Sequence, residues 1–320
     1  SFDKAASLLD VELRKIAVDR HHRFSLDELR EAVDERVMAM VGIAGTTGLG
    51  AVDPIPEMAR IASERDIYFH VDAAFGGFVL PFLEEALESV EPRRGQSDFE
   101  QADRGLRDGE KTGREKNGGK RTAEERTGEA RSEGIGERVG PFDFRVEGVS
   151  SITLDPHKMG RAPIPAGCIL YRNEEIAGIS RTDVGYLSGG KTSQQTIVGT
   201  RSGAAAASVW ATLRKLGRKG YVRTVRSCME VTRYLAEQIR SMDCIELMTE
   251  PTMNVVGFRP AVYASCSRNA AASAESLAEA LRERGYAVSL FPGFIRITVM
   301  PHVDREAVDR FLKEVRDALS

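Results

Sequence analysis

Ser150-Ser-Ile-Thr-Leu-Asp-Pro-His-Lys-Met-Gly160 is the stretch that decides the fold expected of this chain. Its residues 151–154 are rich in β-formers and predict a short strand. Asp155-Pro156 ends that strand, because proline lacks a backbone donor and restricts the residue before it. Lys158 therefore lies on a bend just past a strand end, where a partly desolvated amine is a candidate nucleophile. Taken alone, the same lysine also fits an ordinary solvated loop.

A second stretch, Phe69-His-Val-Asp-Ala-Ala-Phe-Gly-Gly-Phe-Val-Leu80, favours a functional role for this lysine. Residues 68–71 predict another strand, and Asp72 ends it with small residues behind. In an open α/β sheet, ligands bind outside the carboxyl ends of the strands, where Asp72 and Lys158 would both lie. Pyridoxal phosphate needs both groups, a lysine for its aldehyde and an acid that keeps its pyridine nitrogen protonated. The alternative for Asp72 is a carboxylate that caps the next helix.

The composition is that of an ordinary globular protein. The 320 residues are 42% hydrophobic and 29% charged, and the formal net charge is −3, which gives no indication of nucleic-acid binding. The four cysteines are scattered without metal-type spacing and fit a reducing compartment. No apolar run approaches the roughly 20 residues that cross a bilayer. We therefore expect a cytoplasmic protein with no metal, membrane or nucleic-acid partner.

Strand and helix patterns alternate along the first part of the chain, which is typical of a parallel α/β sheet. Residues 11–18 and 37–44 both predict strands, and the second is apolar throughout, as expected for burial on both faces. After residue 215, a long helix, four strands and a closing helix predict a small α+β domain. We expect a large domain over residues 1–215 and a small C-terminal domain over residues 216–320.

Residues 93–140 interrupt this alternation. Charged residues of both signs and glycines dominate the segment, and large apolar side chains are few. Such a composition cannot bury enough apolar surface to offset the entropy lost on ordering. We expect a disordered, charged insertion inside the large domain, without a clear electrostatic partner.

Two motifs carry a family resemblance. His70-Val-Asp-Ala-Ala74, together with Asp155-Pro-His-Lys158, resembles the group II pyridoxal-phosphate amino-acid decarboxylases of fold type I. The longer string Asp155-Pro-His-Lys-Met-Gly-Arg-Ala-Pro-Ile-Pro-Ala-Gly167 is similar to the archaeal L-tyrosine/L-aspartate decarboxylases in particular. The resemblance implies a pyridoxal 5'-phosphate transferase-like fold, with a mostly parallel sheet in the large domain. It also implies decarboxylation of L-tyrosine, L-aspartate or both through a Schiff base at Lys158.

The resemblance implies roles for the residues around Lys158. Asp72 would pair with the pyridinium nitrogen, and Ala74 would pack against one face of the ring. Thr47, in a Gly-Thr-Thr-Gly turn, matches a family threonine near the cofactor, although such turns are common. His157 would donate to the cofactor phosphate, whereas a loop histidine bonded to backbone is the alternative. Asp155 is left without a role, because an acid near a phosphate is unfavourable.

Further roles lie later in the chain. Gly199 and Thr200 resemble the segment that reaches the phosphate of a partner subunit, which implies a homodimer. Tyr186 lies at the spacing where related decarboxylases carry a catalytic loop tyrosine that returns a proton to the substrate carbon. Strand alternation turns Arg296 away from its isoleucine neighbours, towards a cleft or towards water. A guanidinium in a cleft suits a substrate carboxylate, which is the role that the resemblance implies.

The start of the chain departs from the family pattern. A ring-stacking histidine, a glycine-rich phosphate loop and the first strands of the large domain normally precede the position of Ser1. We therefore expect that the N-terminal part of the large domain is missing here. Two alternatives to an active decarboxylase stay open, namely a truncated, inactive remnant and another fold type I lyase. The second alternative covers enzymes like sphingosine-phosphate lyase or tRNA-linked cysteine synthase.

Overall fold

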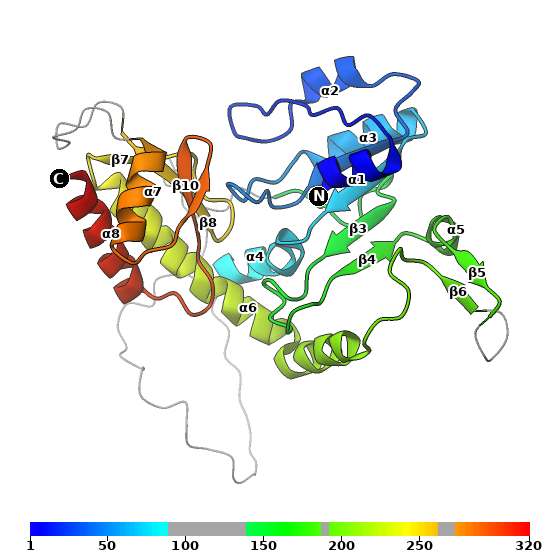
Figure 1. Ribbon diagram of the computed structural model, residues 1–320. Helices are drawn as coiled ribbons and strands as arrows, with labels where there is room; N and C mark the ends of the chain where they lie inside the picture. The colour runs from blue at the N-terminus through cyan, green and yellow to red at the C-terminus, as the bar shows by residue number, and fades with distance from the viewer. Residues whose placement is uncertain (89–138, 187–191, 262–272) are drawn as a thin grey trace, which may run out of the picture.

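The computed structural model describes residues 1–88, 139–186, 192–261 and 273–320. Within these residues the chain forms two four-stranded sheets and a two-stranded hairpin (Figure 1). Almost all of the insertion expected at 93–140 lies outside the described residues, so its expected disorder stays a prediction.

The N-terminal sheet contains both of the stretches that decide the fold. Its strand order is β1-β2-β3-β4, and its strands are β1 (Ala39–Ile43), β2 (Tyr68–Asp72), β3 (Ser151–Leu154) and β4 (Cys168–Tyr171). The first three strands are parallel, and β4 runs antiparallel to β3. This arrangement confirms the expected, mostly parallel sheet. Asp72 pairs with Thr153, so β2 and β3 end at the same edge of the sheet.

This sheet is buried on one face. Met40, Phe69, Val71 and Ile152 belong to a hydrophobic core that also contains the buried side of α3 (Ile55–Glu64). The opposite face is only half-buried, and the exposure pattern of β1 alternates accordingly. The expectation that β1 would be buried on both faces is therefore wrong, because half of its side chains point to the face that α3 does not cover. An apolar run shows that a strand is favourable but does not show what covers it.

The N-terminal segment differs from its expectation as well. It begins with α1 (Phe2–Leu9) and continues to α2 (Leu26–Ala32), whose N-cap Ser25 accepts a hydrogen bond from the backbone N–H of Glu28. The strand expected at residues 11–18 is absent from this segment, where a single antiparallel bridge joins Val18 to Phe24. Val18 is 56% exposed. Strand-forming residues without a neighbouring strand cannot satisfy a ladder of backbone hydrogen bonds, so the segment is irregular.

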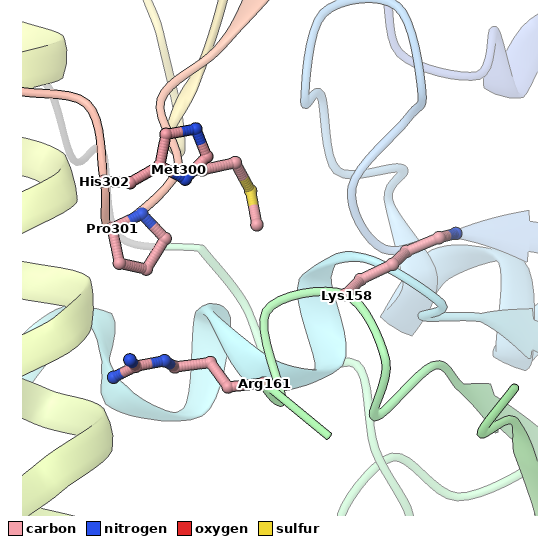
Figure 2. Close-up of a pocket in the computed structure, with 5 residues that line it drawn as sticks. All are labelled: Lys158, Arg161, Met300, Pro301 and His302. Carbon is pink, nitrogen blue, oxygen red and sulfur yellow. The ribbon is translucent and has the colours of Figure 1, made fainter. Parts of the chain in front are cut away.

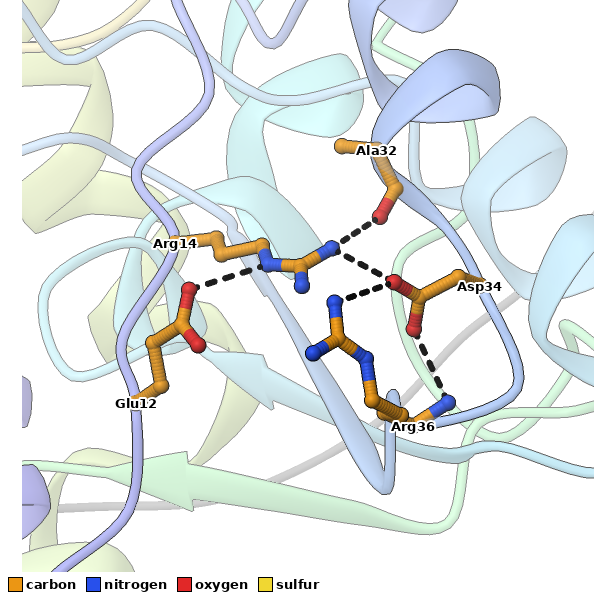
Figure 3. A network of polar contacts seen from close by, with 5 residues as sticks. All are labelled: Glu12, Arg14, Ala32, Asp34 and Arg36. Atoms are coloured by element: carbon orange, nitrogen blue, oxygen red, sulfur yellow. Dashed lines mark hydrogen bonds and ion pairs between the residues drawn. The ribbon is translucent and has the colours of Figure 1, made fainter.

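Charged side chains fasten this irregular segment to the end of α2 (Figure 3). The Arg14 guanidinium donates to the Ala32 carbonyl at 2.9 Å and to Asp34 Oδ2 at 3.0 Å, and it also contacts Glu12 at 3.2 Å. Hydrogen bonds from the Arg36 backbone and guanidinium, and then from Arg14, lower the pKa of Asp34 to about 2. These groups are exposed, so the network orients the segment more than it stabilises the protein.

A helical connection leads from the first sheet to the second. After β4 come α5 (Glu174–Gly178), a hairpin of β5 (Thr182–Val184) and β6 (Thr192–Gln194), and the long helix α6 (Ala204–Arg240). Gly217 interrupts α6 with φ 55° and ψ −178°, a conformation open to glycine. The part of α6 after Gly217 packs against α4 (Leu80–Glu88) and against the second sheet. The domain limit expected at 215/216 lies next to this break and stays a prediction.

The C-terminal sheet is antiparallel, with strand order β7-β8-β10-β9. Its strands are β7 (Ile245–Leu247), β8 (Val255–Pro260), β9 (Ser289–Phe291) and β10 (Phe294–Thr298), and its helices are α7 (Ala274–Glu283) and α8 (Arg305–Leu319). All four expected strands and the closing helix are therefore present. One hydrophobic core joins this sheet, α6 and α4, so the two halves of the chain share buried surface.

A close backbone approach fixes the turn after β2. The short 3-10 helix η1 (Gly76–Phe78) follows Asp72, and Gly76 packs directly on the end of β1. A Cβ atom on Gly76 would lie 2.0 Å from the carbonyl oxygen of Ala44. Because a backbone oxygen cannot move aside cheaply, only glycine fits at this position.

We predict that Gly76→Ala destabilises the protein by at least about 1–3 kcal/mol, because the new methyl group forces the turn away from β1. Gly203→Ala is the matched control, since nothing lies within 4 Å of a Cβ at Gly203. The control should change stability by no more than about 1 kcal/mol. Urea unfolding of both variants measures the difference, and equal effects would contradict the packing described here.

Candidate active site

The two residues singled out as a pair lie at neighbouring strand ends. Asp72 is the last residue of β2, and Lys158 lies on the turn that follows β3. Backbone hydrogen bonds join the two segments, from Ala73 N–H to the Thr153 carbonyl at 3.0 Å and from Asp155 N–H to the Ala74 carbonyl at 3.2 Å. The parallel pairing therefore continues past the strands and holds both segments at one edge of the sheet.

The lysine turn is anchored from the far side by residues that appear much later in the chain. The buried Tyr221 hydroxyl donates to the Gly160 carbonyl at 2.8 Å. The fully buried Asn254 amide donates to the Val299 carbonyl at 2.8 Å and contacts Met159 Sδ at 3.3 Å. Sequence reasoning missed Tyr221 and Asn254, because neither lies in a motif and only tertiary structure brings them to the turn.

Lys158 itself carries a partly exposed amine. Its Nζ lies 2.9 Å from Asp155 Oδ2, and 40% of its side chain is exposed. Beside its aliphatic part is a cavity of about 310 Å³ that is also lined by Arg161, Met300, Pro301 and His302. Figure 2 shows that the lysine nitrogen points away from these four residues, towards the N-terminal part of the chain. The amine nitrogen of Lys158 therefore points away from the other residues that line this cavity.

His157 is held by the backbone of the same turn. Its Nδ1 lies 2.7 Å from the Ala166 carbonyl and 3.2 Å from the Ala166 N–H, and its Nε2 lies 3.9 Å from Asp155 Oδ2. These contacts match the backbone-bonded alternative considered from the sequence. The proposed contact with a phosphate stays a prediction, with Nε2 as the atom left for it.

Asp72 is oriented by its own turn and by a polar face of the sheet. Its Oδ1 accepts a hydrogen bond from Ala74 N–H at 3.0 Å, and Ala74 is half-buried beside it. Two residues earlier, His70 Nδ1 lies 2.8 Å from Ser151 Oγ and its Nε2 lies 2.8 Å from Thr153 Oγ1. In the register of β2 and β3, the histidine and the carboxylate lie on the same face.

The histidine on this face has hydroxyl partners at both ring nitrogens. The Tyr68 hydroxyl donates to Ser151 Oγ at 2.7 Å, and the Ser151 and Thr153 hydroxyls face the two ring nitrogens of His70. Burial lowers the pKa of His70 below its ordinary value, while the charge of Asp72 acts in the opposite direction. Sequence reasoning did not assign His70, although it lies inside the quoted motif.

Thr47 and Arg296 come together although they belong to different sheets. The Arg296 guanidinium donates to the Thr47 carbonyl at 2.9 Å and to Ser289 Oγ at 3.2 Å, and it lies 5.6 Å from the centre of the Phe291 ring. Its Nε is buried and has no hydrogen-bond partner among the described residues, and burial lowers the pKa of the guanidinium. Thr47 is exposed and contributes a backbone carbonyl to this contact.

Three other expected site residues are exposed and lie in the connection between β4 and α6. Tyr186 is 82% exposed beside the β5–β6 hairpin, and the loop residues that follow it lie outside the described part of the chain. Gly199 and Thr200 are exposed just before α6. In Figure 1 the β5–β6 hairpin lies on the side of the molecule away from the C-terminal sheet. No contact with the lysine turn is seen for these three residues in the described part of the chain.

The groups at the strand ends fit pyridoxal phosphate. A primary amine and a carboxylate are the donor set that this cofactor requires, and both are accessible. The small residues after Asp72 leave room for a flat ring, since Ala73 is fully buried and Ala74 is only half-buried. No group of three metal-ligating side chains is present in the described ranges, and none of the described helices is long and apolar enough to cross a membrane.

An α/β sheet that presents a lysine and an aspartate at adjacent parallel strand ends defines the fold type I class of pyridoxal-phosphate enzymes. The pyridoxal-dependent decarboxylase conserved domain matches residues 1–94 and 130–261. The chain therefore belongs to the pyridoxal-dependent decarboxylase family, whose cofactor is pyridoxal phosphate.

Curated relatives are named as amino-acid decarboxylases. The chain is 35% identical to the probable L-tyrosine/L-aspartate decarboxylase of Methanothermobacter thermautotrophicus, over 98% of this chain and 70% of the relative. It is 35% identical to the L-aspartate/L-glutamate decarboxylase of Pyrococcus horikoshii, over 100% of this chain and 68% of the relative. It is 36% identical to the L-aspartate decarboxylase of Thermococcus kodakarensis, over 99% of this chain and 67% of the relative.

Solved structures share the fold. A sphingosine-1-phosphate lyase from Burkholderia pseudomallei has a TM-score of 0.73 at 24% identity, over 99% of this chain and 60% of its own. A glutamate decarboxylase from Lactobacillus brevis has a TM-score of 0.72 at 19% identity, over 99% of this chain and 63% of its own. The chain thus spans roughly 60–70% of the length of the proteins that it matches.

We predict that His70 makes the stability of the protein depend on pH. Because the folded-state pKa lies below the ordinary 6.5, the unfolded chain takes up a proton first as the pH falls. The free energy of unfolding should therefore decrease from about pH 7.5 towards about pH 5.5. The His70→Gln variant should lack this part of the decrease. His302 is exposed, so the His302→Gln variant should show the same dependence of unfolding free energy on pH as the wild type. Urea unfolding at several pH values measures the free energy of unfolding. The same dependence on pH in all three proteins would rule out the effect of His70.

Proposed function

We propose that this chain catalyses pyridoxal-phosphate-dependent removal of the α-carboxyl group of an L-amino acid as carbon dioxide. The observation that carries the proposal is the position of Lys158 and Asp72 at adjacent strand ends, in a chain that belongs to the decarboxylase family. L-Aspartate is the first candidate substrate, because all three relatives described above carry it in their names. L-Tyrosine is the second candidate substrate, since one of these three relatives carries both amino acids in its name.

Each residue of the site has a stated task in this reaction. Lys158 would bind the cofactor aldehyde through its amine, and Asp72 would hold the proton on the ring nitrogen. Ala74 would pack against the ring, and Nε2 of His157 would donate to the phosphate. The bound cofactor supplies the electron sink that accepts the bonding pair of the departing carboxylate. Tyr186 returns a proton to the substrate carbon after carbon dioxide has left.

Arg296 is proposed to bind a carboxylate of the substrate. Its guanidinium is partly desolvated, and its Nε has no hydrogen-bond partner in the described part of the chain. An anion beside it would offset that desolvation through charge-assisted hydrogen bonds. The contacts with Thr47 and Ser289 hold the guanidinium plane in one orientation, so an arriving carboxylate meets a preformed group.

We also propose that two copies form a homodimer in the cytoplasm. The connection that carries Tyr186, Gly199 and Thr200 exposes the large apolar side chains of Ile179 at 76%, Ile197 at 100% and Val198 at 64%, and Trp210 in the first part of α6 is 66% exposed. An exposed apolar surface of this kind is typical of a protein interface. If a second copy bound to this surface, Tyr186, Gly199 and Thr200 of one copy would lie near the lysine turn of the other copy. Sedimentation equilibrium should give twice the chain mass, and a monomeric mass at micromolar concentration would contradict the dimer.

The enzymatic proposal is tested by trapping and by turnover. Borohydride reduction in the presence of pyridoxal phosphate should attach the cofactor to the peptide that contains Lys158. The same protein should release carbon dioxide from L-aspartate, with β-alanine as product, or from L-tyrosine, with tyramine as product. Lys158→Ala should abolish both signals, because the only proposed attachment point is lost. The exposed Lys219→Ala is the matched control and should change neither.

The possible outcomes separate the alternatives. Trapping at another lysine would overturn the assignment of Lys158. Trapping at Lys158 without release of carbon dioxide from either amino acid would favour the two alternatives left open by the sequence, an inactive remnant or a different fold type I lyase. The fold neighbour that is a sphingosine-1-phosphate lyase makes phosphorylated long-chain amino alcohols the next compounds to assay.

A further inference from the structure

The cavity beside the lysine turn lies on the side away from the Lys158 amine (Figure 2). One of its walls is formed by Lys158 and Arg161, and the other is the segment after β10, which contributes Met300, Pro301 and His302. Its volume of about 310 Å³ is in the range of small-molecule sites. We propose that this cavity binds a small organic phosphate, whose phosphate group is held by Arg161 and His302. The inference does not depend on the proposed function, which gives neither residue a task.

The two basic side chains of the cavity have no acidic partner. In the described part of the chain, neither the Arg161 guanidinium nor the His302 ring forms a hydrogen bond or an ion pair. The acids nearest to them in the sequence are engaged elsewhere. Asp155 Oδ2 lies 2.9 Å from Lys158 Nζ, and Asp304 Oδ1 accepts a hydrogen bond from the backbone of α8 at 2.8 Å. The donors of Arg161 and His302 are therefore available to an anion.

Arg161 occupies a backbone conformation that disfavours a side chain. Its φ is 61°, in the left-handed region that costs energy for residues other than glycine. Hydrogen bonds keep it there, from its N–H to the Lys158 carbonyl at 3.0 Å and from Ala162 N–H to the Pro156 carbonyl at 2.9 Å. Strained residues of this kind are concentrated at ligand-binding sites. The strain at a position where glycine would fit freely is a second observation in favour of a ligand.

The positive charge of Arg161 acts on the helix behind the cavity. Figure 2 shows its side chain extending towards α6. Burial raises the pKa of the Cys228 thiol in α6 to about 11, and the charge of Arg161 acts in the opposite direction. The guanidinium therefore contributes a positive potential next to apolar, buried surface, where an anion is attracted more strongly than in open water.

A phosphate monoester matches these groups in shape and charge. The Arg161 guanidinium offers two parallel hydrogen bonds to an oxyanion, and a ring N–H of His302 offers another from the facing wall. A phosphate presents its oxygens in several directions and can meet both walls, whereas a carboxylate presents two oxygens in one plane. Met300 and Pro301 add apolar surface for the organic part of the ligand.

A second basic cavity differs in its charge balance. It has a volume of about 230 Å³ and lies beside α2 and α3, with Arg30, Arg60 and Arg65 among its lining residues. Two of these arginines are already paired with acids, Arg30 with Asp27 at 2.9 Å and Arg60 with Glu64. An anion would have to displace those carboxylates. The second cavity therefore provides the matched control.

The test measures binding to the full 320-residue chain by isothermal titration calorimetry, with phenyl phosphate as the probe. The wild-type chain should bind one equivalent. Arg161→Gly should weaken binding by about tenfold or more, because charge-assisted hydrogen bonds are lost, and His302→Ala by about three- to tenfold. Glycine and asparagine both tolerate the left-handed conformation, so Arg161→Gly and Arg161→Asn should unfold in urea no earlier than the wild type and yet lose binding equally.

Two controls locate the bound phosphate. Arg65→Gln in the second cavity should leave the affinity unchanged, and so should His157→Gln, which alters the residue proposed to hold the cofactor phosphate. Absence of saturable binding by the wild-type chain, or wild-type affinity in both Arg161 variants, would overturn the proposal. Loss of binding in His157→Gln alone would also overturn it, because the probe would then occupy the cofactor site.

A parallel titration with inorganic phosphate tests the organic part of the ligand. Phenyl phosphate should bind more tightly by about threefold or more, because its ring buries apolar surface against Met300 and Pro301. Equal affinities would overturn the assignment of an organic phosphate. The proposed function is tested separately by borohydride trapping at Lys158, so its failure is distinguishable from failure of this inference.

Discussion

The site depends on the parallel pairing of two short strands. Parallel strands point their carboxyl ends to the same edge, and this constraint brings an aspartate and a lysine that are 86 positions apart in the sequence numbering to one place. The ladder extends beyond the strands through the bonds of Ala73 and Asp155. Tyr221 and Asn254 then contact the lysine turn from the opposite side. The conformation of the turn therefore depends on residues from both the N-terminal and the C-terminal part of the chain.

Local patterns are sufficient to predict the strand ends and the two residues that are proposed to bind the cofactor. Asp155-Pro156 follows the end of β3, and Asp72 with the small residues behind it marks the end of β2, so both ends can be predicted from residue types. Lys158 and Asp72 were found because the chemistry of the cofactor requires their functional groups at such ends. Asp155, His70, Tyr221 and Asn254 were not assigned roles, because what they do depends on neighbours that only the folded chain supplies.

The wrong expectations have a common physical cause. Residues 11–18 and the strand β1 are both rich in apolar, β-forming side chains, but the pattern of one strand carries no information about its partners. Residues 11–18 form a single β-bridge instead of a ladder of backbone hydrogen bonds. Strand β1 is covered by α3 on one face only.

The hydrogen bond from Arg296 to the Thr47 carbonyl joins residues that are 249 positions apart. Closing so long a loop costs entropy that local contacts do not repay, so pairings of this kind form late in folding. Each sheet can acquire its own hydrogen bonds before the two meet. The guanidinium proposed to hold the substrate therefore takes its orientation from contact between the two halves of the chain, and neither half contains both partners of this hydrogen bond.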